Sequence, residues 1–309
     1  MTPDTYCDLL AQLIQHPSNE SLADFTEWKA YFNRLSAMES STCHRAIIAG
    51  YQSNCVGFAF AAGYQSALHS MVPSLPNDKI SALCVTEENG NHPRAIETTL
   101  KNHEDNWQLT GKKKFITGGL GADTLLVAAN TGETQQDRPV IKMVKVNRDC
   151  NGVAVNPMPQ LPFVPEIEHA TVEFSQVKCS QDNLLEGDGY ADYVKPFRTI
   201  EDIYVSLALS SYLLKVSRLL KLPKEICELA LANLNQHAFL TTLTATKPMT
   251  HLLVASARRQ LENFIPLLEP LWQERDANSY SNWLRDKALL NIASTPRNLR
   301  TEKAWAQFT

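Results

Sequence analysis

The sequence predicts an α+β protein of several domains, in which a β-domain lies between two helical segments. Three observations predict this order. Apolar residues recur at helical spacing before residue 70, the period changes to two from about 80 to 177, and the helical period returns from about 198. The chain has 309 residues, 44% of them hydrophobic, which is enough to bury a stable core. The domain boundaries that we expect are 1–77, 78–195 and 196–309.

The first segment is predicted to be helical. Residues 4–16, 22–38 and 42–70 carry apolar side chains at helical spacing and contain few glycines or prolines. The stretch AGYQS occurs twice in the third helix, at 49–53 and 62–66. Because a helix turns by about 100° per residue, the two copies do not share a face. We interpret the echo as small residues that let helices pack closely.

The middle segment is predicted to form strands. It contains short runs rich in β-branched residues, separated by Gly, Asn, Asp and Pro. These runs are ISALCVT, WQLTG, TLLVAAN, VIKMVKV, GVAVNP and ATVEF. Strands at this spacing, with no helices between them, favour an antiparallel β-barrel or sandwich.

The last segment is predicted to be a four-helix bundle. Its first helix, EDIYVSLALSSYLLKVSRLLKL, ends at Pro223. Three further stretches have bundle-like length. They are KEICELALANLNQHAFLTTL, PMTHLLVASARRQLENFIPLLEPLW and SYSNWLRDKALLNIASTPRNLRTEKAWAQF.

Composition narrows the class of protein. The net charge of -4 and the pI of about 6.1 show no basic footprint for nucleic acid. Seven scattered cysteines without a CxxC do not indicate a disulfide framework. The N-terminus lacks the features of a signal peptide, and the most apolar run, 56–64, is too short to span a bilayer. No second histidine lies at metal-site spacing from His92, so no metal is expected. We expect a reduced, cytoplasmic, globular protein.

Two short signatures flank a charged stretch in the middle segment. Thr86-Glu87 ends the first predicted strand, and Phe115-Ile116-Thr117 follows LTGKKK about twenty-five residues later. The stretches ADTLLVAAN, KMVKVNRDCNGVAV and HATVEFSQVKCSQDNLLEGDGYADYV follow in turn. In this order the segment resembles the acyl-CoA dehydrogenase family, of which the chain looks like a short, divergent member. The resemblance covers about 80–205 and implies an N-terminal helical domain, a β-barrel and a four-helix bundle.

The resemblance implies FAD as the cofactor. Its isoalloxazine ring would lie against Cys84, Val85, Thr86, Phe115, Ile116 and Thr117. The two threonine hydroxyls and nearby backbone N–H groups would donate to the ring's pyrimidine edge and N5. Phe115 stands where the family often has tryptophan, and Cys84 is read as a small buried hydrophobe. The alternative is that the threonines reflect β-propensity alone.

The resemblance also implies a glutamate that removes the α-proton of an acyl thioester. Most members carry it near the C-terminus after a Gly-Thr turn, which NIASTPRNLRTEKAW lacks, and we expect Glu302 there to be solvated. A minority carry it on the first bundle helix, and alignment from the barrel exit brings Glu201 to that position, with Asp202 in place of the usual arginine. The alternative reading of both carboxylates is a favourable interaction with the helix dipole.

Some landmarks of the family are missing. The arginine that grips the flavin diphosphate should lie in LANLNQHAFLTTLTATKP, which has neither Arg nor Gly; Lys247, Arg258 or Arg259 could substitute. Two functions therefore stay open. One is flavin-dependent α,β-dehydrogenation of an acyl-CoA or other acyl thioester; the other is a cofactor-poor, catalytically silent paralogue that acts as a binding or assembly module. A flavin monooxygenase is a third, lesser alternative. The resemblance further implies a homodimer or homotetramer.

Overall fold

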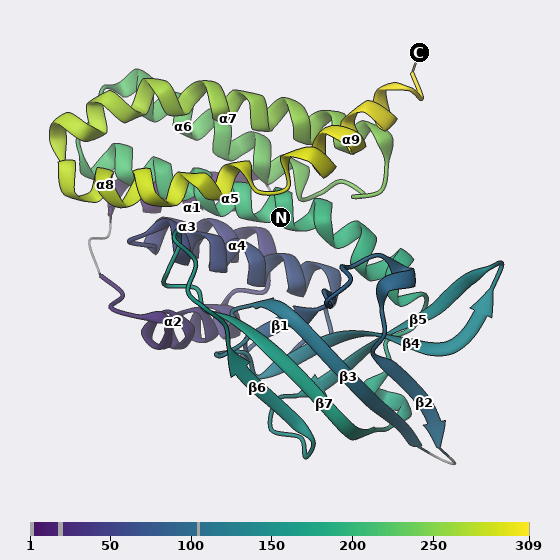
Figure 1. The fold of residues 1–309 in the computed structure, drawn as a ribbon. Coiled ribbons are helices and arrows are strands. Elements are labelled where there is room, and N and C mark those ends of the chain that lie inside the picture. Colours follow the sequence, from purple (N-terminus) through teal and green to yellow (C-terminus); the bar gives the residue numbers. More distant parts are fainter. Residues whose placement is uncertain (1–2, 18–20, 104–105, 309) are drawn as a thin grey trace. The chain divides into compact units, whose positions relative to one another are not determined.

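The computed structural model shows helices and strands that form two compact units (Figure 1). The described residues are 3–17, 21–103 and 106–308. The helical unit comprises 1–70, 162–166 and 199–309, and the β-unit comprises 71–161 and 167–198. The N-terminal and C-terminal helices thus share one unit. The three domain boundaries expected from the sequence stay a prediction.

Among the described residues, the N-terminal part of the chain has four α-helices. They are α1 (Pro3–Gln15), α2 (Phe25–Met38), α3 (Thr42–Gln52) and α4 (Val56–Met71). The sequence predicted one helix where α3 and α4 stand. The helix breaks at Ser53, whose backbone is extended and whose hydroxyl donates to the Ala49 carbonyl at 2.7 Å. A serine that bonds its own backbone in this way competes with continued helix.

The C-terminal part of the helical unit has five α-helices among the described residues. They are α5 (Lys195–Leu219), α6 (Lys224–Leu240), α7 (Pro248–Arg275), α8 (Ala277–Asp286) and α9 (Ser294–Trp305). The sequence predicted one helix in place of α8 and α9. A short 3₁₀ turn at Lys287–Asn291 and the left-handed backbone of Ala293, with φ of 60°, separate them. The helices α6 and α7 lie side by side, and α9 packs on α7 (Figure 1).

Two glycines let α3 and α4 approach α5 closely. A Cβ at Gly50 would meet the backbone of Ala208, and one at Gly63 would meet the backbone of Val205. No side chain fits at either point unless the helices separate. The interpretation of the two AGYQS copies as small-residue packing is confirmed, because each glycine belongs to one copy.

The β-unit is a curled sheet of seven strands in the described part of the chain. They are β1 (Ser81–Cys84), β2 (Thr99–His103), β3 (Asn106–Thr117), β4 (Thr124–Gln135), β5 (Arg138–Asn147), β6 (Val153–Pro157) and β7 (His169–Cys179). The order is β1-β4-β2-β3-β7-β6, with β5 paired to β4. The predicted fold class is confirmed, although β1 and β2 pair with β4 in parallel. A parallel pair needs a long crossover, and for β1 and β4 this is the chain that contains β2 and β3.

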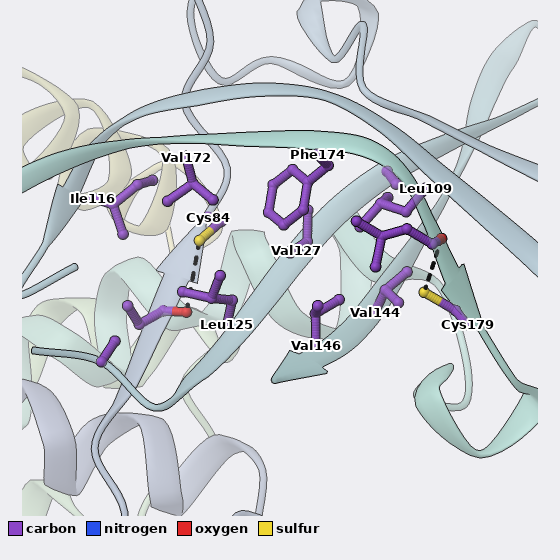
Figure 2. Packing of buried hydrophobic residues seen from close by; sticks show 14 of the residues in the cluster. Cys84, Leu109, Ile116, Leu125, Val127, Val144, Val146, Val172, Phe174 and Cys179 are labelled. Carbon is purple, nitrogen blue, oxygen red and sulfur yellow. Dashed lines mark hydrogen bonds between the residues drawn. The ribbon is translucent and has the colours of Figure 1, made fainter. Parts of the chain in front are cut away.

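The interior of the β-unit is filled by apolar side chains from most of its strands (Figure 2). Cys84, Ile116 and Phe174 all point into this cluster. Within β3 the buried positions are Leu109, Lys113 and Ile116. The cluster therefore fixes which face of β3 is turned outward.

Three of the expectations from composition concern membrane-spanning helices, metal sites and disulfide bonds. Across that part of the chain, no helix combines the length and the apolar character needed to cross a membrane. The same residues contain no cluster of three side chains suited to hold a metal ion. All seven cysteines are free thiols.

Candidate functional site

The first signature follows β1 directly. The strand ends at Cys84, and Thr86 lies two residues beyond it, whereas the sequence placed the motif on the strand itself. Glu87 turns the chain by exchanging backbone hydrogen bonds with Gly90 at 2.9 and 3.2 Å. The Thr86 carbonyl accepts from the backbone N–H of Lys114 at 2.9 Å. This bond joins the first signature to the strand that carries the second.

The second signature contains a β-bulge centred on Phe115. Lys113 pairs with Val172 and Ile116 with Ala170, so β3 has one residue more than β7 in this interval. Phe115 has φ of 56° and its side chain is 52% exposed. A bulky residue at positive φ is strained, and such strain persists only where the surroundings impose it. Bulges of this kind are common beside active sites, where they redirect a side chain.

The other residues that were predicted to contact the flavin ring differ in burial. Cys84 and Ile116 are core residues, and Val85 is also buried, so their side chains do not face solvent. Burial raises the pKa of the Cys84 thiol to about 12, as expected of an inert core cysteine. Thr86 and Thr117 are partly exposed. The groups that can meet a ligand are therefore the Phe115 ring, these two threonines and the backbone.

A buried ion pair lies behind the two signatures. Lys113 Nζ is 2.6 Å from Glu87 Oε1 and 3.2 Å from the carbonyl oxygen of Val85. The Glu87 carboxylate also accepts from the backbone N–H groups of Glu97 and Thr98 at 2.8 and 3.0 Å. Burial would raise the pKa of the Glu87 carboxyl, but Lys113 and these two donors lower it. The pair is charged and anchors both segments.

The ion pair between Lys113 and Glu87 was not predicted from the sequence. Lys113 lies in the run KKK, and three consecutive lysines indicate a solvated surface. A period of two counted from Leu109 would have placed Lys113 on the inner face, together with Gly111. That alternation was the available signal.

Glu201, the predicted base, lies on α5 and is partly buried. Desolvation and the neighbouring Asp202 carboxylate raise the pKa of Glu201 to about 7, against the lowering effect of Arg297 and Arg300. Within the part of the chain that the structure describes, the Glu201 side chain makes no hydrogen bond or ion pair. Its carboxyl oxygens thus keep their lone pairs available.

Asp202 pairs with two arginines of α9. Arg297 Nε donates to Oδ1 at 2.8 Å, and an Arg300 Nη group donates to Oδ2 at 2.6 Å. From the sequence, the role expected of Asp202 was an interaction with the helix dipole. Its arginine partners lie about ninety-five residues away in the chain and leave no local signal. Glu302 on the same helix is exposed, as expected.

The middle of the chain is similar in sequence to known proteins. The family model described as "Acyl-CoA dehydrogenase, middle domain" matches residues 82–177. The probable acyl-CoA dehydrogenase FadE10 of Mycobacterium tuberculosis strain H37Rv is 28% identical over 200 residues, which are 60% of this chain and 30% of that protein. The chain contains a middle domain of the acyl-CoA dehydrogenase family, at residues 82–177. It spans less than a third of the length of that curated relative.

Solved structures share the fold of this chain over nearly its whole length. Butyryl-CoA dehydrogenase from Megasphaera elsdenii superposes with a TM-score of 0.68 and 14% identity, covering 99% of each chain. The structure titled "PigA with FAD and proline" superposes with a TM-score of 0.69 and 13% identity, covering 100% of this chain and 98% of its own. At this level of identity the likeness concerns the fold.

Three basic residues were suggested from the sequence in place of the missing arginine. Lys247 immediately precedes α7 and is exposed. Arg258 already donates to Glu262 at 2.7 Å and to the Leu290 carbonyl at 2.9 Å. Arg259 is exposed and has no hydrogen bond or ion pair to any residue that the structure describes. Lys247 likewise has no side-chain hydrogen bond or ion pair to a described residue, so Lys247 and Arg259 are the two uncommitted candidates.

Proposed function

We propose that this chain is a flavin-dependent oxidoreductase that introduces a double bond between the α- and β-carbons of an acyl thioester, with Glu201 as the base. The observation that carries the proposal is the environment of Glu201. An ordinary glutamate has a pKa of about 4.3, whereas desolvation and Asp202 raise this one to about 7. A general base works best when its pKa is near the operating pH.

Glu201 also has unbonded carboxyl oxygens that can accept a proton. Its carboxylate makes no hydrogen bond or ion pair with any described residue, and a carboxylate held by several donors would be a far weaker base. Asp202, next to it in the sequence, is held by Arg297 and Arg300. The two adjacent carboxyl groups therefore have different tasks: Asp202 is engaged in two ion pairs, while Glu201, whose pKa is raised to about 7, can exchange a proton at neutral pH.

FAD, when bound, would accept the hydride from the β-carbon. The residues of the β-unit fit a flat aromatic ring. The strained bulge turns the Phe115 ring outward, where it is half exposed and lies next to the partly exposed Thr117 in the strand. An exposed aromatic face suits stacking, and the threonine hydroxyl supplies a donor. The buried pair of Lys113 and Glu87 holds this segment in place.

A specific observation favours the second candidate function, a cofactor-poor paralogue that binds or assembles without catalysis. The stretch 231–248 has no arginine and no glycine. Its one histidine, His237, is buried, and burial lowers the pKa of that imidazole to about 4. His237 is therefore neutral and offers no charge to a diphosphate.

The visible absorption spectrum of the purified chain separates the two candidates. We expect flavin absorbance that persists after incubation with excess FAD and desalting. A colourless protein that releases all added FAD would contradict the dehydrogenase and support the silent paralogue. Size-exclusion chromatography with light scattering on the same sample tests the proposed homodimer or homotetramer.

A further inference from the structure

The helical unit contains a cavity of about 360 Å³ whose lining does not include the proposed base, Glu201. Its walls come from α5, α7, α9 and the turn before α9. The volume lies within the range of small-molecule sites, which begins at about 300 Å³. The lining residues that carry the argument are His251, Arg258, Arg259, Glu262, Arg297 and Arg300.

The walls of this cavity are positively charged. Four arginines line it, against the two carboxylates of Asp202 and Glu262. With His251 counted as neutral, four positive and two negative charges leave a surplus of two positive charges. A concave site with a surplus of one sign concentrates ligands of the other sign.

Three of the four arginines are already engaged inside the protein. Arg297 and Arg300 share Asp202, and Arg258 binds Glu262. Arg259 has neither an ion pair nor a hydrogen bond within the described ranges. One guanidinium group is therefore left for a ligand, at the wall of a cavity whose other charges are fixed.

The uncharged lining is rich in hydrogen-bonding groups. It consists in large part of Thr199, Asn291, Ser294, Asn298 and Thr301. Hydroxyl and amide groups bind the hydroxyls and phosphate oxygens of small organic molecules, and the planar fork of arginine matches phosphate oxygens in pairs. A dianionic phosphate would balance the charge of the cavity.

We propose that this cavity binds the phosphate group of a small organic ligand, and that Arg259 supplies the uncommitted guanidinium. The same chemistry could come from the diphosphate of a flavin nucleotide or from the 3′-phosphate of a CoA thioester. Only this choice between two sources rests on the proposed function. The phosphate site itself does not.

Isothermal titration calorimetry on the full chain tests the proposal with three probes: pyrophosphate, ADP and adenosine 3′,5′-bisphosphate. We expect saturable binding of pyrophosphate that weakens as salt is added. Tighter binding of ADP would identify a diphosphate, and tighter binding of the bisphosphate would identify a CoA-type phosphate. Heats that do not saturate with any of the three probes would overturn the proposal.

Two variants of the same helix sharpen the test. Arg259→Gln removes the uncommitted charge and should weaken pyrophosphate about ten-fold or more, since a charge-assisted hydrogen bond contributes that much. Arg275→Gln is the matched control, because Arg275 is also exposed on α7 but does not line the cavity. Equal affinity of the two variants would overturn the role of Arg259.

Asp202→Asn tests the site from the opposite direction. Loss of this carboxylate removes one negative charge from the cavity wall and breaks its ion pairs with Arg297 and Arg300, so pyrophosphate affinity should rise several-fold. A fall in affinity, in a variant whose thermal unfolding is unchanged, would contradict the site. Failure of FAD to bind, with pyrophosphate still bound, would reject the flavin function and leave the phosphate site standing.

Discussion

Lys113 Nζ lies 2.6 Å from Glu87 Oε1, and the lysine side chain is fully buried. Loss of one partner of such a pair leaves an uncompensated charge in the core. Lys113→Met should therefore lower the free energy of unfolding by about 3–5 kcal/mol, as measured by urea denaturation followed by circular dichroism.

The double variant Lys113→Met/Glu87→Gln is the internal control for that measurement. Glutamine carries no charge and keeps an acceptor oxygen for one of the two N–H groups, those of Glu97 and Thr98, that the carboxylate bonds. It should recover a large part of the loss. A double variant that is less stable than Lys113→Met would show that charge compensation is not what the pair provides.

Glu201→Gln should abolish turnover and leave flavin binding intact. The amide is nearly isosteric but cannot take a proton, and general-base catalysis contributes about 10²–10⁴-fold. Acyl-CoA oxidation, followed by bleaching of the flavin, provides the rate. Glu302→Gln, at an exposed carboxylate of α9, serves as control and should keep full activity. Turnover that is unchanged in Glu201→Gln would remove Glu201 from the mechanism.

The rate should depend on pH with an acid limb near 7. Glu201 acts only as a carboxylate, so kcat/KM falls as pH drops through its pKa of about 7. Asp202→Asn removes the negative charge that raises this pKa and frees the positive charges of Arg297 and Arg300 that lower it. The limb should therefore move to lower pH in this variant. A limb that stays in place or moves upward would contradict the assignment.

Phe115→Gly should separate stability from flavin binding. Glycine adopts positive φ without strain, and the exposed ring contributes little packing, so the variant should gain about 1 kcal/mol of unfolding free energy. FAD affinity should fall at the same time, because the stacking face is lost. Asp137→Gly, at φ of 58° in the turn between β4 and β5, is the matched control and should leave FAD affinity unchanged. Equal FAD affinity in both variants would refute a role for the Phe115 ring.

The sequence predicted those features that depend on local pattern. The period of two in TLLVAAN and VIKMVKV became β4 and β5, and the two AGYQS copies packed as small-residue contacts. The bulge at Phe115 could not be predicted, because it arises from the pairing of β3 with β7 rather than from the residues of β3 alone.

In the candidate site, too, local pattern predicted one part, whereas contacts between residues distant in sequence determine the rest. Alignment from the barrel exit brought Glu201 to α5, but its environment depends on the pairing of Asp202 with Arg297 and Arg300. Those partners are distant in sequence and share no motif. The break between α3 and α4 was missed because a single serine is a weak helix stop, and its effect at Ser53 comes from one side-chain hydrogen bond.

The close contacts of Gly50 and Gly63 also bear on the order in which the chain can fold during synthesis. Both glycines lie against α5, which leaves the ribosome only after the whole β-unit has been made. Domains generally fold as units while the chain is being synthesised. The helices α3 and α4 therefore emerge before α5, and the face that contacts α5 stays uncovered in the meantime. The strands that follow them can form the β-unit first. The packing of α3 and α4 is thus completed by a helix that is made much later, and a pause in translation before α5 should prolong their vulnerability to proteolysis.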